Sequence, residues 1–335
     1  MNRFTQWIAD CRAKQAEKER HMTEQERRKA QLVRVLPAIY TPIIAILACM
    51  SSHRSHAAGL DVVETVRTAD VTITVKGQGQ PVLMIPGLNS SADTWTRSCE
   101  ALQPKVQCVT VQLPGFAGAA PSEAFRERLL TRTSEVLAQF IRQRYPQGLP
   151  VAGHSLGGVI GMHLAAKEPA LVRKLLIVDS LPFLSAVRDH SVTAEQVRPG
   201  AEAAYQRSIA SPAAPGANRG FFEQMARTMA LSAPDQARIV QDAEASDPAT
   251  SARAILELMT TDMRPLLPQI KAPTTVLAAW ASTRAFGGSA EQHRQLFQRQ
   301  YASLAQADIR VSQGGLHFLM WDDAALVEKA LAELL

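Results

Sequence analysis

The sequence predicts an α/β protein built on a mostly parallel sheet that helices cover on both faces. From about residue 70, short apolar runs alternate with longer helical patterns, which is the order of strand–helix–strand units. The runs are rich in Val, Leu and Ile, and strands that are apolar on both faces are typical of parallel sheets. A third observation is a long stretch of helical sequence, residues 183–265, that interrupts the alternation late in the chain.

The strand candidates lie at 71–77, 81–87, 106–115, 149–154, 174–180, 272–280 and 307–315. The first alternates apolar and polar residues as an exposed strand does, whereas the second, PVLMIPG, is a continuous apolar run. Helical patterns at 91–102, 122–144 and 156–167 separate the strands, and a helical pattern follows each of the last two.

Residues 183–265 are predicted to form several helices that act as a lid, because they are rich in Ala, Gln, Arg and Met and carry no strand signal. The sheet and its helices then come from two parts of the chain, residues 59–182 and residues 266–335. Within the insertion, FFEQMARTMAL at 221–231 has an apolar face. That face can either pack on the sheet or line a pocket for an acyl chain.

The positive charge of the chain is concentrated at its beginning. The net charge is +5, and residues 1–34 hold nine Lys/Arg against five Asp/Glu, which leaves the rest of the chain close to neutral. No basic stripe with interleaved aromatic residues follows, so nucleic-acid binding is not expected.

A secretory signal is predicted over residues 1–58. The basic stretch QERRKAQLVR precedes an apolar run at 35–50, and small residues that suit cleavage after Ala57 or Ala58 follow it. We therefore expect an exported protein, periplasmic or secreted. Three alternatives use the same residues: an uncleaved membrane anchor at 35–50, a lipoprotein signal ending at Cys49, and a buried helix of the fold. Contact with a membrane is expected only through this segment.

Two of the four cysteines, Cys99 and Cys108, lie in the predicted exported domain. An oxidising compartment permits a disulfide between them, and two separately buried thiols are the alternative. No Cys/His spacing resembles a metal site.

The most specific chemical signal is Gly153-His154-Ser155-Leu156-Gly157, followed by a further glycine. A strand that turns into a helix within a few residues strains the central residue and requires small residues beside it. Ser155 is then held at a helix N-terminus, where backbone N–H groups and the helix dipole favour developing negative charge. The alternative is a glycine-rich connection with an incidental serine, and a strand before and a helix after the motif argue against it.

On this motif, on PGLNSSADTW at 86–95 and on GGLHFLMWDD at 314–323, the chain resembles the α/β-hydrolase family over roughly residues 70–335. The resemblance implies an eight-stranded sheet with Ser155 as nucleophile. It also implies that His317, which follows the last strand, is the base. The family's oxyanion hole falls on the backbone N–H groups of Leu88 and Leu156.

The acid departs from the family's usual pattern. Family members usually place it after the strand that lies here at 272–280, yet no carboxylate follows that strand until Glu291. The preceding strand ends in Asp179, and a minority of family members take the acid from this strand. We therefore expect Asp179 to be the acid, the alternative being a structural aspartate at the start of the insertion.

These residues indicate a serine hydrolase, most simply one that cleaves carboxylic esters through an acyl-enzyme. Thioester, lactone, amide and C–C hydrolysis, and perhydrolysis, use the same residues and stay open. A non-catalytic ligand-binding or signalling protein with a hydrolase shell is the alternative from another class, and the missing carboxylate after 272–280 favours it. The expected partner is a small ester-like molecule with an apolar acyl or alcohol part, and no cofactor is expected.

Overall fold

A computed structural model describes residues 60–68, 70–211, 216–286 and 288–335. The predicted signal or anchor, including the apolar run at 35–50, lies outside the described residues. Among the described helices, none combines the length and the apolar character needed to cross a bilayer.

A single sheet runs through the described part of the chain, with eight strands in the order β1-β2-β4-β3-β5-β6-β7-β8. The strands are β1 (Val62–Arg67), β2 (Thr72–Lys76), β3 (Gln80–Ile85), β4 (Val106–Gln112), β5 (Leu149–His154), β6 (Val172–Val178), β7 (Thr274–Ala279) and β8 (Ala307–Ser312). β2 pairs antiparallel with both β1 and β4, and every pairing from β4 to β8 is parallel. The predicted fold class, with its mostly parallel eight-stranded sheet, is confirmed. β1 had no separate signal in the sequence, because it is an edge strand with mostly exposed side chains.

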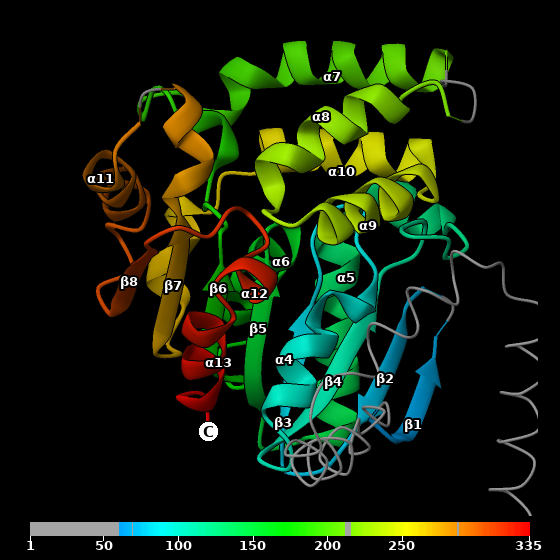
Figure 1. Ribbon diagram of the computed structural model, residues 1–335, viewed down its shortest axis with the longest axis vertical. Coiled ribbons are helices and arrows are strands. Elements are labelled where there is room, and N and C mark those ends of the chain that lie inside the picture. Colours follow the sequence, from blue (N-terminus) through cyan, green and yellow to red (C-terminus); the bar gives the residue numbers. More distant parts are fainter. Residues whose placement is uncertain (1–59, 69, 212–215, 287) are drawn as a thin grey trace, which may run out of the picture. The chain divides into compact units, whose positions relative to one another are not determined.

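Helices cover both faces of the sheet (Figure 1). Outside the insertion they are η1 (Ala92–Trp95), α4 (Thr96–Ala101), α5 (Glu123–Arg144), α6 (Leu156–Lys167), η4 (Trp280–Phe286), α11 (Ala290–Gln300), α12 (Leu319–Asp322) and α13 (Ala324–Ala332). Successive side chains of a strand point to opposite faces of the sheet, so they belong alternately to two apolar clusters. In β3, for example, Leu83 lies in the cluster under α5, α6 and α11, and Met84 lies in the cluster under α4, α12 and α13.

Between β6 and β7 the chain forms a group of helices, called the insertion below. Its elements are η2 (Leu184–Ala186), α7 (Ala194–Ala210), α8 (Arg219–Met229), α9 (Ala233–Glu244), α10 (Pro248–Thr260) and η3 (Arg264–Gln269). Figure 1 shows α7 to α10 together beyond one end of the sheet, with α7 outermost.

The inserted helices are attached to the rest of the fold to different degrees. At Arg128, where α5 leaves helical geometry, the backbone N–H groups of Leu129 and Leu130 donate to the Glu257 carboxylate of α10 at 2.9 and 2.7 Å. These bonds satisfy main-chain donors that the break in α5 leaves without an intrahelical acceptor. In contrast, α7 has no buried residue. α10 is therefore fixed to the core, whereas α7 lies at the surface of the insertion.

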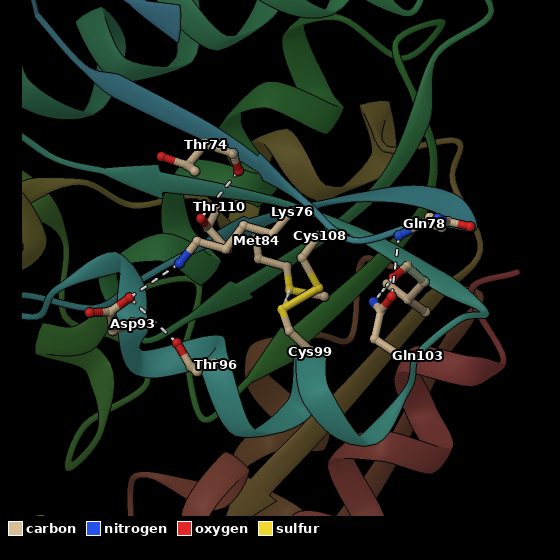
Figure 2. The surroundings of a disulfide bond; sticks show 11 residues. Thr74, Lys76, Gln78, Met84, Asp93, Thr96, Cys99, Gln103, Cys108 and Thr110 are labelled. Atoms are coloured by element: carbon tan, nitrogen blue, oxygen red, sulfur yellow. Dashed lines mark hydrogen bonds and ion pairs between the residues drawn. A yellow bond between two sulfur atoms is a disulfide. The ribbon is translucent and has the colours of Figure 1, made fainter. Parts of the chain in front are cut away.

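Cys99 of α4 and Cys108 of β4 form a disulfide, with Cα atoms 6.1 Å apart (Figure 2). The structure thus selects one of the two arrangements that the sequence left open. Met84 lies beside the bond, so the disulfide belongs to the apolar cluster under α4.

Candidate active site

Ser155 occupies a sharp turn between β5 and α6. Its backbone has φ 52° and ψ −117°, which lies outside the regions that non-glycine residues favour. Its N–H donates to the main-chain oxygen of Val178 on the neighbouring strand β6 at 3.0 Å. The strand therefore ends, and the helix begins, at a residue held in a strained conformation by its surroundings.

Gly153 and Gly157 allow this turn to close. A Cβ atom built on Gly153 would lie 2.2 Å from the main-chain oxygen of Gly157. A Cβ atom built on Gly157 would lie 2.3 Å from the main-chain oxygen of Ile85, at the end of β3. Both contacts are with backbone, which cannot move aside, so only glycine fits at either position.

The two predicted oxyanion donors come from segments that meet at this turn. Leu156 is the first residue of α6, and the N–H groups of the first helical turn have no intrahelical acceptor. Leu88 follows Gly87, whose position is so close to the serine that a Cβ atom there would lie 3.2 Å from the Ser155 Cβ. The segment carrying Leu88 thus packs directly against the elbow.

The structure joins His317 to Asp179. Nδ1 of His317 lies 2.6 Å from Oδ2 of Asp179, and the two side chains are only 21% and 13% exposed. The other carboxylate oxygen of Asp179 accepts a hydrogen bond from the Ala279 N–H at 2.8 Å. Because Nδ1 is engaged with the carboxylate, Nε2 is the nitrogen of His317 that remains for proton transfer.

Unusual backbone conformations occur at and beside the candidate site residues. Four non-glycine residues in the described part of the chain have positive φ: Asn89, Ala117, Ser155 and Asp179. Three of them lie at the elbow, at the end of β6 and beside Leu88. Conformations of this kind persist where surrounding structure imposes them, and they cluster at functional sites.

Two titratable groups lie near Asp179, the half-buried His293 and the buried Tyr301. Burial lowers the pKa of His293 on α11, and the negative charge of Asp179 opposes that shift. Burial raises the pKa of Tyr301 well above its ordinary value, and the Tyr301 hydroxyl donates to the Ser180 main-chain oxygen at 2.8 Å.

The sequence did not reveal how the insertion reaches the loop after β3. The Ser251 hydroxyl of α10 donates to Oδ1 of Asn89 at 2.6 Å, and the Ser91 N–H donates to the Asp242 carboxylate of α9 at 3.0 Å. No local motif signals such contacts, because the partners lie about 150 or more residues apart in the chain.

The insertion also contacts the loop that carries His317. The Phe318 N–H donates to the Met229 main-chain oxygen at 3.0 Å. Asp322 accepts from the Leu231 N–H at 3.0 Å and from the Leu316 N–H at 3.0 Å. Burial raises the pKa of Asp322, and these two N–H donors oppose that shift.

Among the described residues, no cluster of His, Cys, Asp and Glu could hold a metal ion. The structure pairs the imidazole of His317 with the carboxylate of Asp179 and places the Ser155 hydroxyl at the N-terminus of α6. Such a set can activate a hydroxyl and bind an oxyanion.

Comparison with known proteins gives the following matches. A family model described as "Alpha/beta hydrolase family" matches residues 82–330. A pimeloyl-[acyl-carrier protein] methyl ester esterase of Legionella pneumophila is 34% identical over 125 residues, which are 36% of this chain and 46% of that protein. The matched region thus spans less than half of that relative.

Two solved structures have similar folds. A hydrolase from Pseudomonas aeruginosa aligns with a TM-score of 0.63 at 17% identity, covering 83% of this chain and 99% of that one. A thermophilic esterase from Thermogutta terrifontis aligns with a TM-score of 0.62 at 19% identity, covering 81% and 97%. At these identities the similarity describes the fold alone.

The close backbone approach at the elbow gives a stability prediction. Gly157→Ala places a methyl group against the Ile85 main-chain oxygen, and we expect it to lower the free energy of unfolding by about 2–3 kcal/mol. Gly161→Ala, one turn later in α6, meets only side chains, Leu175 at 3.2 Å and Val151 at 3.7 Å, and should change stability by less than about 1 kcal/mol. Urea unfolding of both variants measures the difference, and equal stabilities would contradict the role given to Gly157.

Proposed function

Since the chain belongs to the alpha/beta hydrolase family, we propose that it is a serine hydrolase that cleaves carboxylic esters of small molecules. One observation carries the proposal: the 2.6 Å bond between His317 and Asp179, two residues that lie 138 positions apart and are predicted as base and acid. The esterase named among the relatives supports an ester as the bond cleaved.

In the proposed reaction, the Ser155 hydroxyl attacks the ester carbonyl carbon while His317 Nε2 takes the hydroxyl proton. The carbonyl oxygen becomes negatively charged and accepts hydrogen bonds from the Leu88 and Leu156 N–H groups. Removing one such donor costs roughly 2.7–4 kcal/mol in a comparable enzyme. Asp179 stabilises the imidazolium, which then protonates the departing alcohol. Water, activated by His317, releases the acid from the acyl-enzyme and restores Ser155.

Two alternatives are weighed against ester hydrolysis. Hydrolysis of thioesters, lactones, amides or C–C bonds, and perhydrolysis, would use the same groups and are alternative reactions for the same site. A non-catalytic shell was favoured by the lack of a carboxylate after β7, and the bond from Asp179 to His317 supports the catalytic alternative instead.

In this proposal, the helices at 183–265 cover the site as a lid between the two core parts, residues 59–182 and 266–335. Their bonds to the loops that carry Asn89 and Phe318 support this role. Phe222 and Met229 pack against the apolar cluster under α4. This supports the view that the apolar face of residues 221–231 packs on the core. The proposed substrate has an apolar acyl or alcohol part.

A fluorophosphonate probe and short-chain p-nitrophenyl esters test the nucleophile and the base. Wild-type protein should be labelled and should hydrolyse the esters, and Ser155→Ala and His317→Ala should lose activity to similar extents. The double variant should be little worse than either, because the two residues act as one unit. Ser208→Ala, at an exposed position of α7, is the control and should keep labelling and activity. Activity that survives in Ser155→Ala rejects the proposal.

Asp179→Asn tests the acid. The Ala279 N–H should donate to the new amide oxygen, so the amide NH₂ points toward Nδ1 of His317. Nδ1 must then accept a hydrogen bond, and the imidazole proton moves to Nε2. His317 then cannot accept the serine proton, and in a comparable triad this change lowers kcat about 10⁴-fold. We expect a loss of that order with unchanged unfolding, measured by steady-state kinetics and thermal melting. Full activity in the folded variant means that the acid is another group or is not needed.

We further propose that the chain is exported, with residues 1–58 as signal or anchor. The disulfide between Cys99 and Cys108 supports this location, because such bonds persist in oxidising compartments. Mass spectrometry of periplasmic protein should find a chain beginning at Ala58 or Gly59 with the disulfide formed, whereas Ile44→Arg should retain the precursor inside. Acylated Cys49 indicates the lipoprotein alternative, and an intact wild-type chain in the cytoplasm contradicts export.

A further inference from the structure

His154 is a buried histidine that the proposed reaction does not use. It is the last residue of β5, it is 1% exposed, and its Nε2 lies 3.1 Å from the main-chain oxygen of His317. A carbonyl oxygen only accepts hydrogen bonds, so Nε2 carries the hydrogen and donates it. The two imidazole rings lie 4.6 Å apart.

The surroundings hold His154 in the neutral form. Burial lowers its pKa well below the ordinary value, and the nearby charge of protonated His317 lowers it further. With the hydrogen on Nε2, Nδ1 bears only a lone pair, and within the described structure this buried atom has no hydrogen-bond partner. The ring also packs against Phe318, with ring centroids 4.7 Å apart, and Gly87 leaves room for it.

We propose that His154 is a positioning residue, which fixes the main chain of the base His317 relative to the nucleophile through its Nε2–H bond. His154 and Ser155 are adjacent in the chain, so this one hydrogen bond connects the segment that carries the nucleophile to the main chain of the base. The inference rests on the proposed function of Ser155 and His317.

The neighbouring peptide groups are held independently of His154. Asp322 binds the Leu316 N–H before the base, and Met229 binds the Phe318 N–H after it. The loop therefore keeps both of these main-chain bonds when the His154 donor is removed. The expected consequence is a small displacement of His317 rather than loss of the loop, which affects the chemical step more than substrate binding.

A matched pair of substitutions separates the hydrogen bond from the volume of the ring. His154→Gln keeps an N–H donor about as far from the main chain as Nε2, and His154→Met has a side chain of similar size without a donor. We expect His154→Met to lower kcat about 10–100-fold with KM within about threefold, as small misplacements of catalytic groups do. We expect His154→Gln to keep kcat within about fivefold of wild type.

The outcomes distinguish this inference from the proposed function. If the wild type neither hydrolyses esters nor reacts with a fluorophosphonate, the proposed function fails and the inference fails with it. If the wild type is active and both variants have the same kcat, or if only KM changes, the positioning role alone is overturned. Thermal melting checks folding. If His154→Met does not fold, His154→Phe replaces it, since it keeps an aromatic ring on Phe318 without a donor.

Discussion

The turn at Ser155 is a strained backbone conformation, and such a conformation costs about 1–3 kcal/mol wherever the surrounding structure enforces it. Here β5 and α6 are buried on both sides of it, and glycines let the main chains approach to contact. The other parts of the site are placed relative to this turn. Val178, the last residue of β6 and the neighbour of Asp179, accepts a bond from the Ser155 N–H, and the His154 ring donates to the carbonyl of His317. The geometry of the site is thus set by main-chain contacts.

The position of the acid follows from the spacing of parallel strands. β6 and β7 are neighbours, so their carboxyl ends lie about 5 Å apart at the same edge of the sheet. Asp179 stands at the end of β6, and its carboxylate accepts a bond from the Ala279 N–H at the end of β7. The Asp179 carboxylate is therefore directed toward the end of β7, where family members usually carry the acid. A positive φ at Asp179 accompanies this direction of the side chain.

The inserted helices α8 to α10 are attached to loops on both sides of the elbow. Ser251 holds Asn89 beside the predicted oxyanion donor, and Asp322 connects Leu231 of the insertion to the peptide before His317. Movement of these helices is consequently coupled to both loops. α7 packs on α10 and has no buried residue, so it has the least apolar contact to lose.

The sequence by itself determined the fold class, the positions along the chain of the strands from β2 onward and the elbow at Ser155. These features are local: apolar periodicity, glycine spacing and the change from strand to helix are written in consecutive residues. Tertiary structure decided the rest. The bond from Asp179 to His317 and the bond from His154 to the His317 carbonyl depend on which strand ends the sheet brings side by side. The disulfide between Cys99 and Cys108 depends on how α4 packs against β4. Hydrogen bonds and covalent bonds of this kind act over about 2–3 Å, and no residue pattern reports a distance of that size between two packed segments.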